Sequence, residues 1–179
     1  MSFSRAKKKV YSEEELYEYA VGALARRMRS VAQLKRLLRQ KVEADTEFGQ
    51  TLVELIIRKL KDQGYVNDAK YAAAYSSFRR DNEKFGRMRV ITDLKAKGVH
   101  ADVIDTAISD TYDDVNEEKQ ARAYLQRKRL SKPKDQKQTA RIFRQLVRAG
   151  FRSKTIFTIL KKWEVDDEML TALEAETQG

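Results

Sequence analysis

Four basic side chains share one face of a helix that the sequence predicts over residues 137–150. Lys137, Arg141, Arg144 and Arg148 are separated by 4, 3 and 4 residues, a spacing that aligns them in one stripe. Because no acidic residue alternates with them, they repel one another rather than stabilise the helix. We interpret the stripe as a basic ridge that binds DNA phosphates or acidic protein groups. The alternative is an ordinary solvated face of an amphipathic helix.

Other basic residues are weaker candidates for the same kind of contact. They are Arg26, Arg27 and Arg29 near the N-terminus, Arg79, Arg80, Arg87 and Arg89 in the middle, and Arg152 after the ridge. Some arginines of this kind only lay their aliphatic stems on apolar surface or pair with nearby acids. Each of them is a candidate partner-binding or DNA-binding residue.

The sequence provides no set of residues for catalysis. It contains no cysteine and no glycine-rich phosphate loop, and His100 is its only histidine. Asp113, Asp114, Glu117 and Glu118 have the chemistry to hold Mg²⁺, but acids clustered at a helix start more often stabilise the helix dipole. We therefore predict a protein that acts by binding, with no metal, no cofactor and no small-molecule substrate.

Four aromatic residues lie between glycine turns and apolar faces. Tyr65, Tyr71, Tyr75 and Phe151 could act as platforms on which nucleic-acid bases stack. Their regular placement beside apolar residues favours core packing instead.

The net charge of +10 is concentrated in one part of the chain. Residues 119–162 contain 15 Lys and Arg but a single acid, Asp135, whereas residues 98–118 contain 7 acids and no Lys or Arg. A polarised charge distribution says little about fold, but it does indicate the type of partner. Phosphates or acidic protein surfaces are the partners expected for the basic segment.

The composition favours an all-α protein. One proline and seven glycines are too few for the many turns of an all-β fold, and charged residues reach 36%, which suits an elongated molecule. Without cysteines, a signal peptide or a long apolar segment, the chain is expected in the cytoplasm and not in a membrane.

Apolar spacing predicts three successive triplets of helices. The first triplet has helices over about 13–28, from Ser30, and from Thr51 to Gly64, and the second begins at Asn67, an N-cap beside which Asp68 also favours the helix start. The third opens at Asn116 and breaks around Pro133. The starts of the middle helices are 56 and 52 residues apart, as tandem repeats require.

These repeats give five expected segments. They are a basic flexible arm over 1–11, three-helix repeats over 12–66, 67–115 and 116–165, and a short C-terminal helix or tail over 166–179. Repeats that bury faces against their neighbours predict an elongated, curved molecule built of helix-turn-helix-like units.

Three segments resemble the RecX family of regulatory proteins. They are residues 20–30 followed by Leu34, Leu37, Leu38 and Lys41; residues 64–72 with Arg79, then 86–91 with Leu94 and 97–99; and residues 148–153 with Ile156 and Leu160. The resemblance extends over about residues 16–163, with the segments in the family's order. Gln33 is one departure, since the family commonly has Glu there.

The resemblance implies a regulator of the RecA recombinase. Members of this family are described as three tandem three-helix units that lie in the groove of the RecA filament on DNA and reduce strand exchange and ATP hydrolysis. Two other readings stay open: a nonspecific DNA-binding protein of tri-helical repeats with no RecA partner, and a metal-dependent nuclease. The nuclease would need a cluster of carboxylates or histidines that the sequence does not contain.

Overall fold

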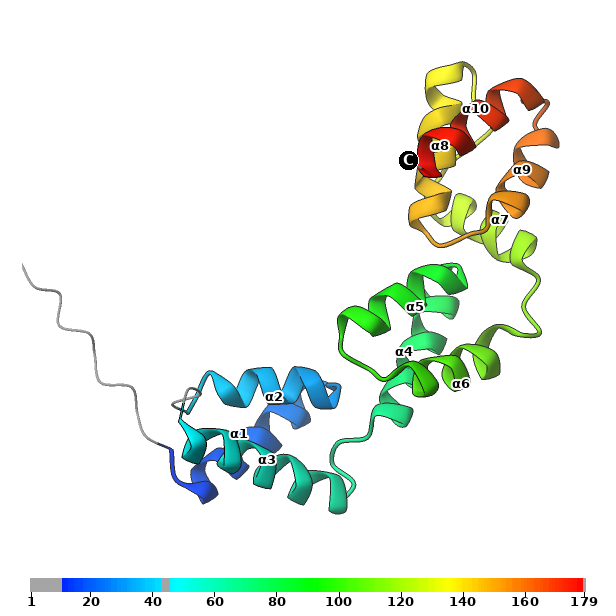
Figure 1. Ribbon diagram of the computed structural model, residues 1–179. Coiled ribbons are helices and arrows are strands. Elements are labelled where there is room, and N and C mark those ends of the chain that lie inside the picture. The colour runs from blue at the N-terminus through cyan, green and yellow to red at the C-terminus, as the bar shows by residue number, and fades with distance from the viewer. Residues whose placement is uncertain (1–10, 43–45, 179) are drawn as a thin grey trace, which may run out of the picture. The chain divides into compact units, whose positions relative to one another are not determined.

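The computed structural model describes residues 11–42 and 46–178. These residues form ten α-helices and no β-strand, which confirms the all-α prediction (Figure 1). Within this part of the chain, every helix is too short or too polar to cross a membrane.

Backbone contacts divide the chain into two compact units. One consists of residues 1–71 and 97–100, and the other of residues 72–96 and 101–179. Helix α4 (Asp68–Asp81) begins in the first unit and continues in the second.

Three helices and the first turn of α4 form the first unit. Helices α1 (Glu13–Arg26), α2 (Val31–Arg39) and α3 (Glu47–Asp62) pack against one another (Figure 1). Their shared core consists of Leu16, Ala20, Leu34, Leu38, Val42, Leu52, Val53, Ile56, Ile57, Leu60 and Val66. Helix α3 contributes Val53, Ile56, Ile57 and Leu60 to this core.

Two helix boundaries differ from the prediction. Helix α1 ends at Arg26, so Met28 lies beyond it and is 56% exposed instead of buried. Helix α3 begins at Glu47 rather than Thr51, because the Thr46 side chain accepts a hydrogen bond from the Gly49 amide at 3.0 Å and caps the helix earlier.

Helix α5 (Arg87–Ala96) packs on α6 (Ala101–Tyr112) within the second unit. Val90 and Leu94 from α5 are buried, as are Ile104, Ala107 and Ile108 of α6. Phe78 of α4, by contrast, is 54% exposed.

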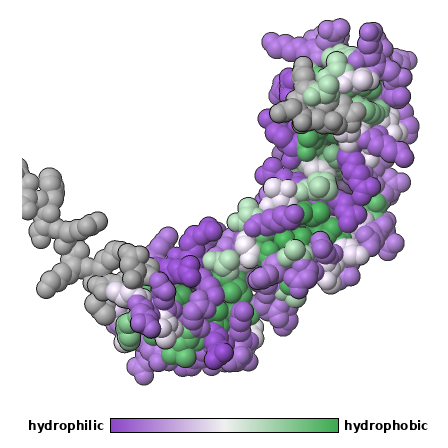
Figure 2. All heavy atoms as spheres, in the orientation of Figure 1, coloured by the Kyte–Doolittle hydropathy of each residue, from purple (hydrophilic) through white to green (hydrophobic). Residues whose placement is uncertain are grey.

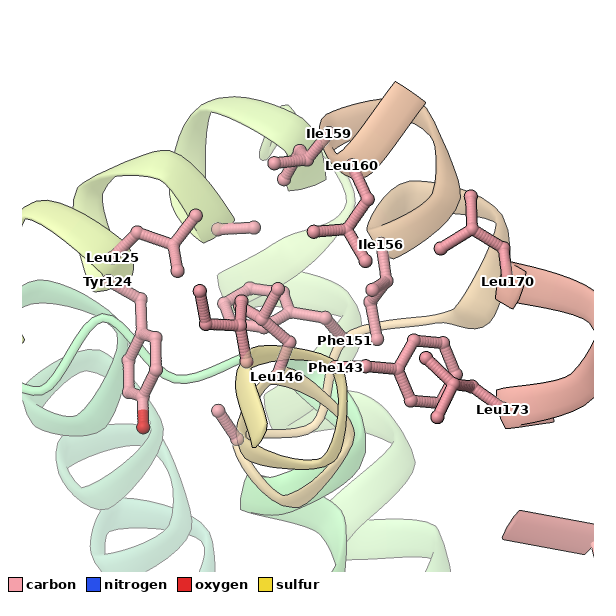
Figure 3. Packing of buried hydrophobic residues seen from close by; sticks show 13 residues of the cluster. Tyr124, Leu125, Phe143, Leu146, Phe151, Ile156, Ile159, Leu160, Leu170 and Leu173 are labelled. Carbon is pink, nitrogen blue, oxygen red and sulfur yellow. The ribbon is translucent and has the colours of Figure 1, made fainter. Parts of the chain in front are cut away.

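Four further helices complete the second unit. They are α7 (Glu117–Arg127), α8 (Gln136–Arg148), α9 (Ser153–Lys161) and α10 (Asp167–Gln178). Figure 3 shows side chains from all four converging on one core, among them Tyr124, Phe143, Ile156 and Leu170. The predicted break around Pro133 and the predicted tail helix are both present.

A close backbone contact joins the start of α5 to the turn after α8. The Gly86 amide donates to the Ala149 carbonyl at 2.9 Å, and the Met88 amide to the Gly150 carbonyl at 3.3 Å. A Cβ on Gly86 would lie 2.3 Å from the Gly150 oxygen, so only glycine fits there. Gly86 and Gly150 therefore hold the start of α5 and the turn after α8 together within the second unit.

A similar contact joins the start of α2 to the turn after α5 in the first unit. The Ser30 hydroxyl donates to the Lys97 carbonyl at 2.6 Å, and a Cβ on Gly98 would lie 2.5 Å from the Ala32 Cβ. Ser30 also forms a capping box with Gln33. Because Gln33 completes the box, the departure from the family's usual Glu leaves the cap intact.

The boundaries between the predicted repeats stay a prediction, as does the elongated shape. Of the predicted basic arm, residues 1–10 lie outside the described part of the chain.

Candidate functional site

The predicted basic ridge lies on the solvent face of α8. Lys137, Arg141, Arg144 and Arg148 are all exposed, whereas the opposite face of the helix buries Thr139, Ile142, Phe143 and Leu146. Figure 2 shows hydrophilic residues over the end of this unit that contains the α7–α8 loop and the start of α8. The ridge is therefore displayed to solvent by a helix whose other face is fixed in the core.

Most of the positive charges on the ridge have no acidic partner among the described residues. Among the residues that the structure describes, none forms an ion pair with Lys137, Arg141 or Arg148, whereas Arg144 takes part in an interaction of its own. The only acid in this basic segment, Asp135, caps α8 by accepting from the Gln138 amide at 2.7 Å. The positive field of the ridge is thus available to an external anion.

Other cations of the same segment are neutralised within the chain. Glu118 accepts from Arg122 at 3.0 Å and from Lys162 at 2.7 Å. These two hydrogen bonds lower the pKa of the Glu118 carboxyl. The ridge therefore differs from these two paired cations.

Arg79 and Arg89 are engaged inside the second unit. Both pair with Asp93, at 3.4 Å and 3.0 Å, and both guanidinium groups lie over the Phe85 ring, at 5.3 Å and 5.5 Å from its centroid. Tyr75 completes the group: it accepts from Arg79 and donates to Asp93, both at 2.8 Å. Burial raises the pKa of Tyr75 to about 12, so its hydroxyl remains a donor at neutral pH.

The other two arginines of the middle segment differ from each other. Arg80 pairs with Asp81 at 2.7 Å and donates to the Thr111 carbonyl at 2.7 Å. Arg87 instead lines a cavity of about 170 Å³ together with Arg152. The structure does not bring these arginines onto the α8 stripe.

The N-terminal arginines lie at the end of α1 and on the link to α2: Arg26 is the last residue of α1, and Arg27 and Arg29 follow it. Arg26 and Arg27 are exposed, whereas Arg29 is half-buried and its Nε donates to the Ala23 carbonyl at 3.4 Å. Desolvation lowers the pKa of Arg29, with Arg27 and Arg26 as smaller contributors. Arg29 therefore closes the end of α1 while Arg26 and Arg27 extend into solvent.

The prediction of core packing is confirmed for two of the four aromatic residues. Tyr71 and Phe151 are buried, and Tyr75 is half-buried in the Asp93 group. For Tyr65 the interpretation is wrong, since 54% of the residue is exposed. It follows the helix-ending Gly64, whose positive φ of 74° turns the chain outward.

Comparison with known proteins identifies the family. A model of the second three-helix domain of RecX matches residues 67–108. The RecX regulatory protein of Bacillus pumilus is 35% identical over 136 residues, which are 75% of this chain and 50% of that protein. The RecX regulatory protein of Trichlorobacter lovleyi is 30% identical over 151 residues, covering 83% of this chain and 95% of that protein.

The chain belongs to the RecX family.

A solved RecX structure agrees on the fold. The crystal structure of RecX from Lactobacillus salivarius matches with a TM-score of 0.63 at 21% identity, covering 85% of this chain and 96% of that one. The chain spans about half the length of the Bacillus pumilus relative. The relatives are named regulatory proteins, which agrees with the expectation of a non-enzymatic role.

Two acidic residues of this RecX-family chain have roles that the sequence did not reveal. Asp68 accepts from the Val31 amide at 2.8 Å, so it caps α2, whereas Asn67 caps its own helix through the Lys70 amide at 2.9 Å. Glu117 accepts from the Arg152 amide at 3.2 Å and from the Thr155 hydroxyl at 2.6 Å, which ties α7 to the start of α9. No local pattern signals such caps, because donor and acceptor are more than 30 residues apart.

The acids that the sequence suggested as Mg²⁺ ligands do not form one site, because most of them bind other groups of the chain instead. Glu117 and Glu118 are both bound to partners within the chain, and Asp113 accepts from the Ser109 hydroxyl. Within the part of the chain that the structure describes, no three acidic or histidine side chains gather where they could hold a metal ion.

Proposed function

We propose that this RecX-family chain is a non-enzymatic regulator that binds the RecA filament on DNA and reduces its recombinase and ATPase activities. The observation that supports this proposal best is the exposed ridge of α8, where Lys137, Arg141 and Arg148 have no acidic partner among the described residues. Membership of the RecX family supports RecA as the partner, because the resemblance implies a regulator of RecA.

The ridge has the chemistry for a filament surface. Desolvated charges at an interface must meet opposite charges, and both DNA phosphates and acidic protein groups provide them. Arg26, Arg27 and Arg152 are further exposed cations that a long filament could contact. Arg79, Arg80 and Arg89 contribute less to the proposal, because their charges already bind Asp93 and Asp81.

A direct assay tests the proposal. RecA-catalysed ATP hydrolysis on single-stranded DNA and strand exchange are measured with increasing amounts of this protein. Both rates are expected to fall in parallel, at protein concentrations below that of RecA. Unchanged rates at equimolar protein would contradict a RecA partner.

The runner-up is a DNA-binding protein with no RecA partner, and salt titration separates the two. We expect naked DNA to bind weakly and without sequence preference, with an affinity that falls steeply with salt, because cations on phosphates release counterions. If Arg141 and Arg148 both contact phosphates, replacing them with glutamine lowers the slope of log K against log salt by about 1.8 on duplex DNA. Fluorescence anisotropy with two unrelated duplexes measures this slope, and tight binding of both naked duplexes at physiological salt would favour the runner-up.

A further inference from the structure

A small apolar pocket lies in the first unit, apart from the α8 ridge. It has a volume of about 160 Å³ and is lined by the end of α1, the link that follows it, the α3–α4 turn and the start of α4. Of its lining residues, Val66 and Tyr71 are buried and Leu24 is half-buried, whereas Met28 and Tyr65 are 56% and 54% exposed. Two large apolar side chains exposed beside one pocket indicate a contact site rather than scattered surface residues.

The pocket is formed in advance of any partner. On the turn side, the Tyr65 amide donates to the Leu60 carbonyl at 2.9 Å and Asn67 caps α4. On the other side, Arg29 is held by the Ala23 carbonyl and Ser30 by its capping box. Because these hydrogen bonds fix both walls, little of the binding free energy is needed to order the pocket.

Cations surround the pocket. Arg29 and Lys70 belong to its lining, and Arg26 at the end of α1 and Arg27 just after it are exposed. None of these four cations forms an ion pair among the described residues. This charge selects a ligand whose apolar group is flanked by negative groups.

We infer that this pocket binds the apolar side chain of an acidic peptide segment carried by a protein partner. A cavity of about 150 Å³ accommodates a benzene-sized group, so one phenylalanine or leucine side chain fits. The lining favours a peptide over a nucleic-acid base, because Leu24, Met28 and Val66 contribute aliphatic and thioether groups. Of the two tyrosines in the lining, Tyr71 is buried, so Tyr65 alone offers an exposed aromatic face on which a base could stack. Methionine adapts to differently shaped apolar side chains.

Binding of a model peptide tests this inference without RecA. The probe is a short fluorescein-labelled polyglutamate peptide with one central phenylalanine, and a peptide with serine in place of phenylalanine is its control. We expect the phenylalanine peptide to bind roughly tenfold to a hundredfold more tightly, since it buries a whole aromatic side chain. Equal binding of the two peptides would show that charge alone attracts them and would overturn the inference.

The methionines localise the contact. The chain has four, so ¹³C-methyl labelling gives a simple NMR spectrum in which Met28 and Met88 are a matched pair, 56% and 50% exposed. The peptide is expected to shift the Met28 methyl and not the Met88 methyl, and Met28→Gln to remove the preference for phenylalanine while Met88→Gln keeps it. A shift of Met28 by oligothymidine but not by the peptide would overturn the inference in favour of a base.

Discussion

Replacing both Arg141 and Arg148 with glutamate is expected to abolish the inhibition of RecA while the fold is retained. Both side chains are exposed on α8 and neither has an ion-pair partner among the described residues, so the change costs the free protein only a fraction of a kcal/mol. In an interface, each reversal replaces attraction with repulsion and costs about 1.4 kcal/mol or more. The concentration for half-maximal inhibition of the RecA ATPase should therefore rise by roughly a hundredfold or more.

The matched control is the reversal of two exposed cations away from α8. Arg58→Glu with Lys95→Glu changes the net charge by the same amount and is expected to leave inhibition within a few-fold of the parent. Arg144 is kept in both variants, because it takes part in another interaction within the chain. A folded ridge variant that inhibits as well as the parent would mean that α8 is only a solvated face.

The class of fold could be predicted from the sequence because the apolar periodicity is strong. Leu34 and Leu38, or Phe143 and Leu146, mark buried helix faces that the structure reproduces. The ends of helices were less predictable. A single hydroxyl, that of Thr46, moves the start of α3, and Met28 falls outside α1 although its spacing continues the apolar face.

The arginines show why sites are harder to predict than helices. The ridge follows from spacing on one helix, so its four residues do lie on one exposed face. Arg79 and Arg89 look equally available in the sequence, yet both bind Asp93. Arg89 lies four residues before Asp93 on α5, whereas Arg79 of α4 meets Asp93 only once the two helices have folded together. Asp68 and Glu117 cap helices distant in sequence for the same reason.

Replacing Gly150 with alanine is expected to destabilise the second unit strongly. Its φ is +89°, a conformation that costs alanine about 1 kcal/mol or more, and a Cβ would lie 2.2 Å from the Arg89 amide nitrogen. The overlap involves backbone that is fixed by the Gly86 and Met88 hydrogen bonds, so relief requires the turn to separate from α5. We expect a loss of roughly 3–5 kcal/mol from strain and overpacking together. Urea unfolding followed by fluorescence of Trp163, the only tryptophan, reports on this unit.

Alanine substitutions at two other glycines separate the two causes of this loss, steric overlap and backbone strain. A substitution at a third glycine, where neither cause applies, serves as a control. Gly86 has ordinary φ but no space, with Gly150 oxygen 2.3 Å from its Cβ, so Gly86→Ala measures the overlap alone. Gly64 has φ +74° and open space, so Gly64→Ala measures conformational strain alone, about 1–2 kcal/mol by circular dichroism. Gly22 lies inside α1 with open space around it, so Gly22→Ala should raise the free energy of unfolding by about 0.5–1 kcal/mol. If Gly150→Ala cost no more than Gly64→Ala, the turn after α8 would have to move away from α5 freely, and the contact between them would not hold the second unit together.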